Sequence, residues 1–213
     1  ASNQTKVYGT ADPELTAVVD GTIGEDVVTF VLNRAEGENV GEYAITPTGD
    51  AEQGNYTVSY TNGTLTITAA TLTDITATPY SGTYDGIAHT IEVTIPDGAA
   101  IKYGTAEGTY DMDEAPDYTN VGTYTIFYQV TKDNYNAVIG SQTVTINSKA
   151  VTVTADNQTK VYGTADPELT AIIDGTIGED KVTYVLSRAE GEDVGEYAIT
   201  PSGDTEQGNY VVL

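Results

Sequence analysis

The densest group of potential metal ligands is an acidic run near the middle of the chain. Its members are Asp111, Asp113, Glu114 and Asp117. Carboxylate oxygens at close spacing suit Ca²⁺, which takes about six to eight oxygen ligands. The run lacks the glycine and the terminal glutamate of the helix–loop–helix calcium motif. Calcium is therefore the one cofactor that the sequence proposes, and a solvated acidic loop is the alternative.

Two lysines occupy the same position in two copies of a TKVYG segment, at Lys6 and Lys160. A covalent isopeptide crosslink would need a buried lysine with a lowered pKa and a neighbouring acid. The sequence does not identify that acid. The alternative is a lysine whose stem lies on the sheet and whose amine stays in water.

Three tyrosines are candidates for a surface that faces a glycan or a protein partner. Tyr103, Tyr110 and Tyr118 lie in the least regular part of the central segment, whereas other tyrosines alternate within strand-like runs and are expected in the core. The single histidine, His89, has no evident partner for a catalytic triad. A pair of catalytic carboxylates would also need a cleft that small modules rarely provide. We therefore expect no enzymatic activity.

The composition excludes several classes of protein. The chain has 213 residues, with 8 Lys and Arg against 32 Asp and Glu, so its net charge is −24. This charge repels nucleic acid and anionic membrane surfaces, so we expect neither nucleic-acid binding nor membrane insertion. There is no cysteine, which excludes disulfides and thiolate metal sites. Apolar residues make up 39% of the chain, enough for a core to form.

The elements that must position these residues are β-strands. Apolar and polar residues alternate with period two at 64–68, 91–95 and 124–131, as in half-buried strands. Turn dipeptides such as Asn62-Gly63 and Asp85-Gly86 separate such runs. The one candidate helical turn begins at Asp12, which could be an N-cap with Pro13 at the first helical position.

The chain contains a long internal repeat. Residues 1–59 match residues 155–213 at a constant offset of 154, with 48 of 59 positions identical. A different segment lies between the copies. We therefore expect three modules: segment A (1–70), segment B (71–148) and segment A′ (149–213). Strand-like runs join the segments without a Gly/Ser-rich spacer, which favours an elongated rod of small β-sandwich, Ig-like modules. The alternative is a β-grasp arrangement with one short helix at 12–19.

The repeated motifs resemble a known family. The runs NQTKVYGTADPEL, GEYAITPTGD and NGTLTITAA are similar to the YGX-type MBG repeats of bacterial surface proteins, whose signature includes the Tyr8-Gly9 and Tyr162-Gly163 pairs. Segment B, with YSGTYDGIAHTIEV and NVGTYTIFYQV, resembles the YDG-like and Ig-like repeats that alternate with them. The resemblance implies an extracellular, cell-surface-anchored bacterial protein, adhesin-like or stalk-forming, without catalytic residues.

The resemblance also bears on the two copies. Segment A lacks the strand that precedes the second copy at 150–154, and segment A′ lacks an equivalent of 60–70. The simpler expectation is an excerpt of a longer array whose partners are neighbouring repeats. The alternative is self-association, in which an open edge accepts a strand from another chain and builds a filament.

Three functions follow as hypotheses. The first is a structural stalk or spacer of a cell-surface adhesin. The second is a filament subunit that assembles head to tail by strand exchange. The third is direct binding of host glycans or proteins by segment B.

Overall fold

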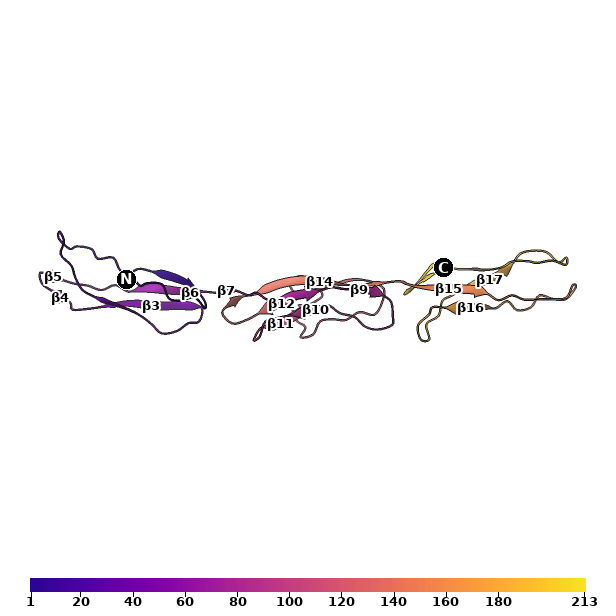
Figure 1. The fold of residues 1–213 in the computed structure, drawn as a ribbon, viewed down its shortest axis with the longest axis horizontal. Helices are drawn as coiled ribbons and strands as arrows, with labels where there is room; N and C mark the ends of the chain where they lie inside the picture. Colours follow the sequence, from indigo (N-terminus) through magenta and orange to yellow (C-terminus); the bar gives the residue numbers. More distant parts are fainter. The chain divides into compact units, whose positions relative to one another are not determined.

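The regular structure consists entirely of β-strands (Figure 1). The computed structural model describes residues 1–213, is all-β without a helix and is consistent with Ig-like β-sandwich modules, which confirms the expected fold class. The β-grasp alternative with a short helix is wrong, because residues 12–19 form no helix. The carboxylate of Asp12, expected to cap that helix, instead binds the side chains of Lys6 and Arg34. The structure has no helix long and apolar enough to cross a membrane.

The chain divides into two compact units. Residues 1–75, 95–101 and 129–139 form the first unit, and residues 76–94, 102–128 and 140–213 form the second. The chain passes between the two units five times, at 75/76, 94/95, 101/102, 128/129 and 139/140, and all five points lie in segment B. The division into three modules stays a prediction.

The first unit is built around a mixed four-stranded sheet with the order β1-β6-β3-β2. The strands β1 and β6 are parallel, and the other pairs are antiparallel. A short hairpin, β4–β5, and a parallel pair, β7 with β13, complete the unit. The strands are β1 (Gln4–Val7), β2 (Val31–Arg34), β3 (Gly41–Thr48), β4 (Glu52–Gln53), β5 (Tyr56–Thr57), β6 (Gly63–Thr68), β7 (Ala70–Thr71) and β13 (Tyr135–Asn136).

The core of the first unit follows the alternation of its strands. Leu65 and Ile67 on β6 are fully buried, while the threonines between them are not. They pack with Ile45 on β3, which is also fully buried. In Figure 1, β3 and β6 run side by side, as their antiparallel register requires.

The remaining sheets lie wholly or mostly in the second unit. A four-stranded sheet has the order β11-β12-β14-β9, and another has the order β16-β15-β20-β19. Two antiparallel pairs, β8 with β10 and β17 with β18, accompany them. The strands are β8 (Thr76–Thr78), β9 (Tyr80–Thr83), β10 (Glu92–Thr94), β11 (Ala100–Gly104), β12 (Gly122–Thr131), β14 (Val138–Asn147), β15 (Lys149–Ala155), β16 (Ala171–Asp174), β17 (Val185–Arg188), β18 (Ile199–Ser202), β19 (Glu206–Gln207) and β20 (Tyr210–Val212).

The predicted period-two pattern is confirmed along β12. Ile126 and Tyr128 are buried, while the residues between them are more exposed. Val144 and Ile146 on β14, and Val151 on β15, are buried in the same alternating manner. Side chains of a strand point to opposite faces in turn, so one face of each strand forms the core.

Candidate functional site

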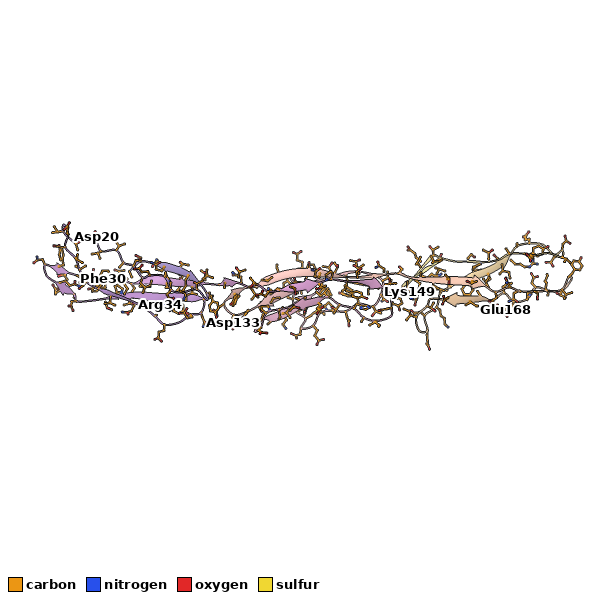
Figure 2. The ribbon with its side chains drawn as sticks, viewed as in Figure 1. Asp20, Phe30, Arg34, Asp133, Lys149 and Glu168 are labelled. Carbon is orange, nitrogen blue, oxygen red and sulfur yellow. The ribbon has the colours of Figure 1, made fainter.

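Four charged side chains form a closed cluster at the start of segment A. Lys6 lies on β1 with a side chain only 4% exposed, and its Nζ is 2.7 Å from Asp12 Oδ1 and 2.5 Å from Glu38 Oε2. Arg34, at the end of β2, binds the other oxygens of the same acids, with Nε 2.6 Å from Asp12 Oδ2 and Nη2 against Glu38. Figure 2 labels Arg34. Two cations and two anions therefore alternate around one site.

The same cluster recurs in segment A′, 154 residues further on. Lys160 Nζ lies 2.6 Å from Asp166 and 2.7 Å from Glu192, while Arg188 lies 2.7 Å from Asp166 and 2.5 Å from Glu192. We name the two sets the charge clusters. Each cluster connects the segment that follows a Tyr-Gly pair to the turn that follows β2 or β17, the strands that end at Arg34 and Arg188.

The electrostatics favour ion pairs over a covalent bond. Hydrogen bonds to Asp12 and Glu38 raise the pKa of Lys6, and the bonds from Arg34 and Lys6 lower the pKa of Asp12. An amide-forming lysine must present a neutral amine, and a raised pKa keeps the amine protonated. The expectation of an amine in water is also wrong for Lys6, because its side chain is buried and its charge is paired with two acids that are themselves exposed.

The turn beyond Arg34 is closed by an aromatic ring. Arg34 Nη1 donates to the carbonyl oxygens of Ala35 and Gly37, and its guanidinium lies 5.7 Å from the centre of the Tyr43 ring. Gly37 has a φ of 134°, and a Cβ on it would collide with the Tyr43 ring. The turn therefore needs glycine for both its conformation and its close approach.

The structure does not bring the proposed calcium ligands together. Among residues 1–213, no group of three or more His, Cys, Asp or Glu side chains is arranged to hold a metal ion. Of the four candidates, Asp113 makes an ion pair, with Lys102. Asp111, Glu114 and Asp117 make no ion pair. The acidic run has the features of the solvated loop that was the alternative.

The three candidate tyrosines do not form one open surface. Tyr103 is 9% exposed and lies in the core, which corrects the expectation that it faces a ligand. Tyr118 stacks on Tyr124 with ring centroids 3.9 Å apart. Tyr110 is half-buried. His89 stacks on Tyr80 and lies 3.0 Å from Asp85.

An asparagine in segment B joins segment A within the first unit. Asn134 Nδ2 donates to Asn39 Oδ1 at 3.0 Å, and Asn134 Oδ1 accepts from the Val40 N–H at 2.8 Å. Its backbone carbonyl accepts from the N–H of Ala70 at 3.0 Å, at the start of the parallel pair β7 and β13. One residue thus contacts both the turn before β3 and the chain just after β6, which lie at the same end of the segment A sheet.

The second unit repeats this arrangement with different residues. Asn209 Nδ2 donates to Asn120 Oδ1 at 3.0 Å, and Asn209 Oδ1 accepts from the Val121 N–H at 2.8 Å. The Asn209 carbonyl accepts from the N–H of Lys149 at 3.0 Å, at the start of the parallel pair β15 and β20. All three hydrogen bonds match those of Asn134 in kind and length.

A pair of tyrosines accompanies each asparagine. Tyr8 and Tyr135 meet edge to face with centroids 5.5 Å apart, and Tyr84 and Tyr210 do the same at 5.5 Å. In the second unit both hydroxyls also donate to Asp180, at 2.9 Å from Tyr84 and 2.7 Å from Tyr210. We call each set of asparagine and tyrosine contacts a joint.

Sequence reasoning missed the joints, although their parts are visible in the sequence. The signals are the Asn-Val-Gly-x-Tyr runs at 39–43 and 120–124, and the Asn-Tyr pairs at 134–135 and 209–210. The paired asparagines are 95 residues apart in the first joint and 89 in the second. No local pattern connects residues at that separation.

The repeated architecture agrees with a comparison against family models. The model described as MBG domain (YGX type) matches residues 1–66 and 151–212, more than half of the chain. The chain belongs to the MBG domain family, YGX type. The two MBG matches contain the two charge clusters. The resemblance of segment B to YDG-like repeats stays a prediction. No curated protein matches the chain.

Proposed function

We propose that this MBG chain is a non-catalytic spacer segment of a secreted bacterial cell-surface adhesin. Its partners would be neighbouring repeats of the same protein, and its place would be outside the cell. A spacer needs modules that stack in series with a defined contact, because freely hinged modules would not hold a binding domain at a fixed reach. MBG membership supports a repeat domain of surface proteins.

The observation that carries the proposal is the recurrence of the joint. Segments A and B make a joint in the first unit, and segments B and A′ make one in the second unit. Although the sequences differ, both joints have the same three asparagine hydrogen bonds and the same tyrosine contact. Side-chain hydrogen bonds to backbone restrict rotation at a connection more than a strand link alone does. A contact used twice in one chain is suited to a longer series.

Relaxation of backbone ¹⁵N nuclei in the full chain tests the proposal. We expect residues 1–66 and 129–139 to share one rotational correlation time, and Asn134→Ala to separate the two values. Asn55→Ala is the matched control, because Asn55 precedes a tyrosine in the same way but is exposed and makes no side-chain hydrogen bond. Independent tumbling in the unmodified chain would contradict a rigid connection.

Direct binding of host glycans or proteins by segment B has less support. Tyr103 is buried and Tyr118 is stacked within the fold. Stacking on a sugar needs an exposed ring face. Binding by the full chain on a glycan array is the measurement that would favour this function over a spacer.

A further inference from the structure

A pocket of about 490 Å³ lies beside the first joint. Both tyrosines of that joint, Tyr8 and Tyr135, line it, and so do the charged side chains Lys132 and Asp133. Asp133, labelled in Figure 2, belongs to the turn between β12 and β13. All the lining residues belong to the first unit. The volume falls within the range of about 300–1,000 Å³ that is typical of small-molecule sites.

The second joint shows what a pair of tyrosine hydroxyls in this arrangement binds. Tyr84 and Tyr210 both donate to Asp180 Oδ2, at 2.9 Å and 2.7 Å. In the first joint the rings of Tyr8 and Tyr135 meet at the same centroid distance of 5.5 Å, but their hydroxyls make no hydrogen bond within the protein. Solvent reaches both hydroxyls, because no buried polar side-chain atom lacks a partner. They are accessible donors on residues that line the pocket.

The turn that supplies Asp180 has a counterpart beside the first joint. The N–H of Asp180 closes a turn by donating to Ile177 O at 3.0 Å, and the N–H of Ala99 closes a turn by donating to Pro96 O at 3.1 Å. The first turn lies between β16 and β17, and the second lies between β10 and β11. Both chain neighbours of Ala99 line the pocket. The first joint therefore has a methyl group where the second joint has a carboxylate.

The pocket also contains a cation that no acid of the protein pairs. Lys132 Nζ donates to the backbone carbonyl of Asp97 at 2.7 Å and lies 5.4 Å from the centre of the Tyr135 ring. No ion pair involves Lys132. An ammonium group has three donors, so two remain for a ligand. The second joint has the neutral Gln207 at this position, two residues before its asparagine.

We propose that this pocket binds an acidic sugar, whose carboxylate takes the position that Asp180 has in the second joint. The hydroxyls of Tyr8 and Tyr135 and the ammonium of Lys132 donate to that carboxylate. Charge-assisted hydrogen bonds of this kind are stronger than neutral ones. Asp133 accepts from the sugar hydroxyls, which favours a hydroxylated acid over a bare carboxylate. The proposal does not depend on the spacer function.

Titration of the ¹⁵N-labelled full chain with sodium glucuronate tests the proposal. The total ionic strength is held at about 150 mM, where screening limits the effect of acids more than about 8 Å away. We expect saturable shifts of amide resonances at 97–100 and 131–135, with a dissociation constant in the millimolar range. Glucose, which lacks the carboxylate, should cause no such shifts, and acetate, which lacks the hydroxyls, should bind more weakly than glucuronate.

Three variants separate the pocket from the charge of the chain. Ala99→Asp supplies the carboxylate from the protein itself, so it should abolish glucuronate binding and raise the melting temperature. Ala51→Asp adds the same charge at an exposed position of the same unit outside the pocket, so it should leave binding unchanged. Lys132→Gln copies the second joint and should weaken binding by about tenfold, because it removes a charged hydrogen-bond donor.

Four outcomes would overturn the proposal. They are the absence of saturable shifts up to about 50 mM glucuronate, equal shifts with glucose, equal affinity for acetate, and unchanged binding by Ala99→Asp. If Ala99→Asp does not fold, Lys132→Gln decides the matter, and an unchanged affinity of that variant would overturn the proposal.

Discussion

Lys6 and Lys160 have the same neighbours in sequence but different surroundings. The side chain of Lys6 is 4% exposed, whereas that of Lys160 is 22% exposed. Lys6 lies on β1, which pairs with β6, while residues 157–161 form no strand. The charge cluster persists in both places. Its geometry is therefore set by the four charged side chains, and its burial is set by the sheet beneath them.

The charge clusters should make stability depend on acid. Bonds from Arg188 and Lys160 hold the pKa of Asp166 at about 2, below its ordinary value of 3.8, and the pKa of Glu192 is lowered by Lys160 and Arg188. A lowered pKa in the folded state contributes stability above the unfolded value that is lost as the pH falls through the folded value. We expect the urea midpoint to fall between about pH 4 and pH 2.

Urea unfolding between pH 7 and pH 2 measures this effect, with Asp166→Asn as the comparison. The variant cannot change charge at this position, so its midpoint should be lower at pH 7 and vary less with acid. A variant with the same pH dependence as the unmodified chain would show that Asp166 does not contribute. The raised pKa of Lys160 predicts a further loss of stability above about pH 10.5.

The second joint predicts a stability difference between two asparagines in the same Gly-Asn-Tyr context. Asn209→Ala removes two side-chain hydrogen bonds and should lower the free energy of unfolding by about 1–3 kcal/mol. Asn55→Ala removes none and should change it by less than about 0.5 kcal/mol. Urea denaturation of both variants measures the difference. Equal effects would mean that the joint adds no stability.

At the scale of strands, the two copies differ in how their central strand is covered. In segment A, β3 lies between β2 and β6, whereas the corresponding β18 pairs with β17 alone. Ile45 on β3 is 0% exposed and packs on Leu65 and Ile67. Ile199 occupies the same repeat position on β18 and is only half-buried. Ile45 is the more buried of the two because it packs on β6, which has no counterpart in residues 149–213.

This difference predicts unequal costs for one substitution. Ile45→Ala should lower the free energy of unfolding by about 2–5 kcal/mol, because it leaves a cavity among fully buried side chains. Ile199→Ala should cost less than about 2 kcal/mol, since its site is already partly hydrated. Thermal denaturation followed by near-ultraviolet circular dichroism compares the variants. A larger loss for Ile199→Ala would contradict this account.

The strands were the most predictable elements. Alternation predicted the buried faces at Leu65 and Ile67 and along β12, because period two is a local property. The helical turn at Asp12 was predicted from local capping signals and failed, because its carboxylate is used by Lys6 and Arg34. The charge cluster joins residues up to 32 positions apart. Only the fold brings such residues together, so spacing alone could not predict the cluster.

At the scale of the whole molecule, the charge clusters contain half of the positively charged side chains but only a small share of the acidic ones. The chain has 8 Lys and Arg, and four of them, Lys6, Arg34, Lys160 and Arg188, belong to the charge clusters. Each cluster is electrically balanced. The net charge of −24 therefore comes from acids outside the clusters, which face one another mainly through solvent.

Salt should consequently stabilise the chain. We expect the melting temperature to rise between about 10 mM and 150 mM NaCl, because screening shortens the reach of acid–acid repulsion from about 30 Å to about 8 Å. CaCl₂ at equal ionic strength should produce a similar rise, since no group of three acidic side chains is arranged for a metal. Calorimetry in the two salts decides this. A clearly larger rise with calcium would restore the acidic run at Asp111–Asp117 as a binding site.

The joints also determine how the protein ages chemically. Asparagine slowly loses its amide nitrogen and becomes aspartate, which keeps its acceptors but has no donor. A joint with one aspartate retains its hydrogen bond, because the remaining asparagine can donate to it, and Asp193 already occupies the position of Asn39 in segment A′. A joint with two aspartates places two carboxylates against each other. Conversion of either Asn39 or Asn134 to aspartate is therefore expected to keep the side-chain hydrogen bond between them, whereas conversion of both leaves the bonds from the Val40 and Ala70 N–H groups.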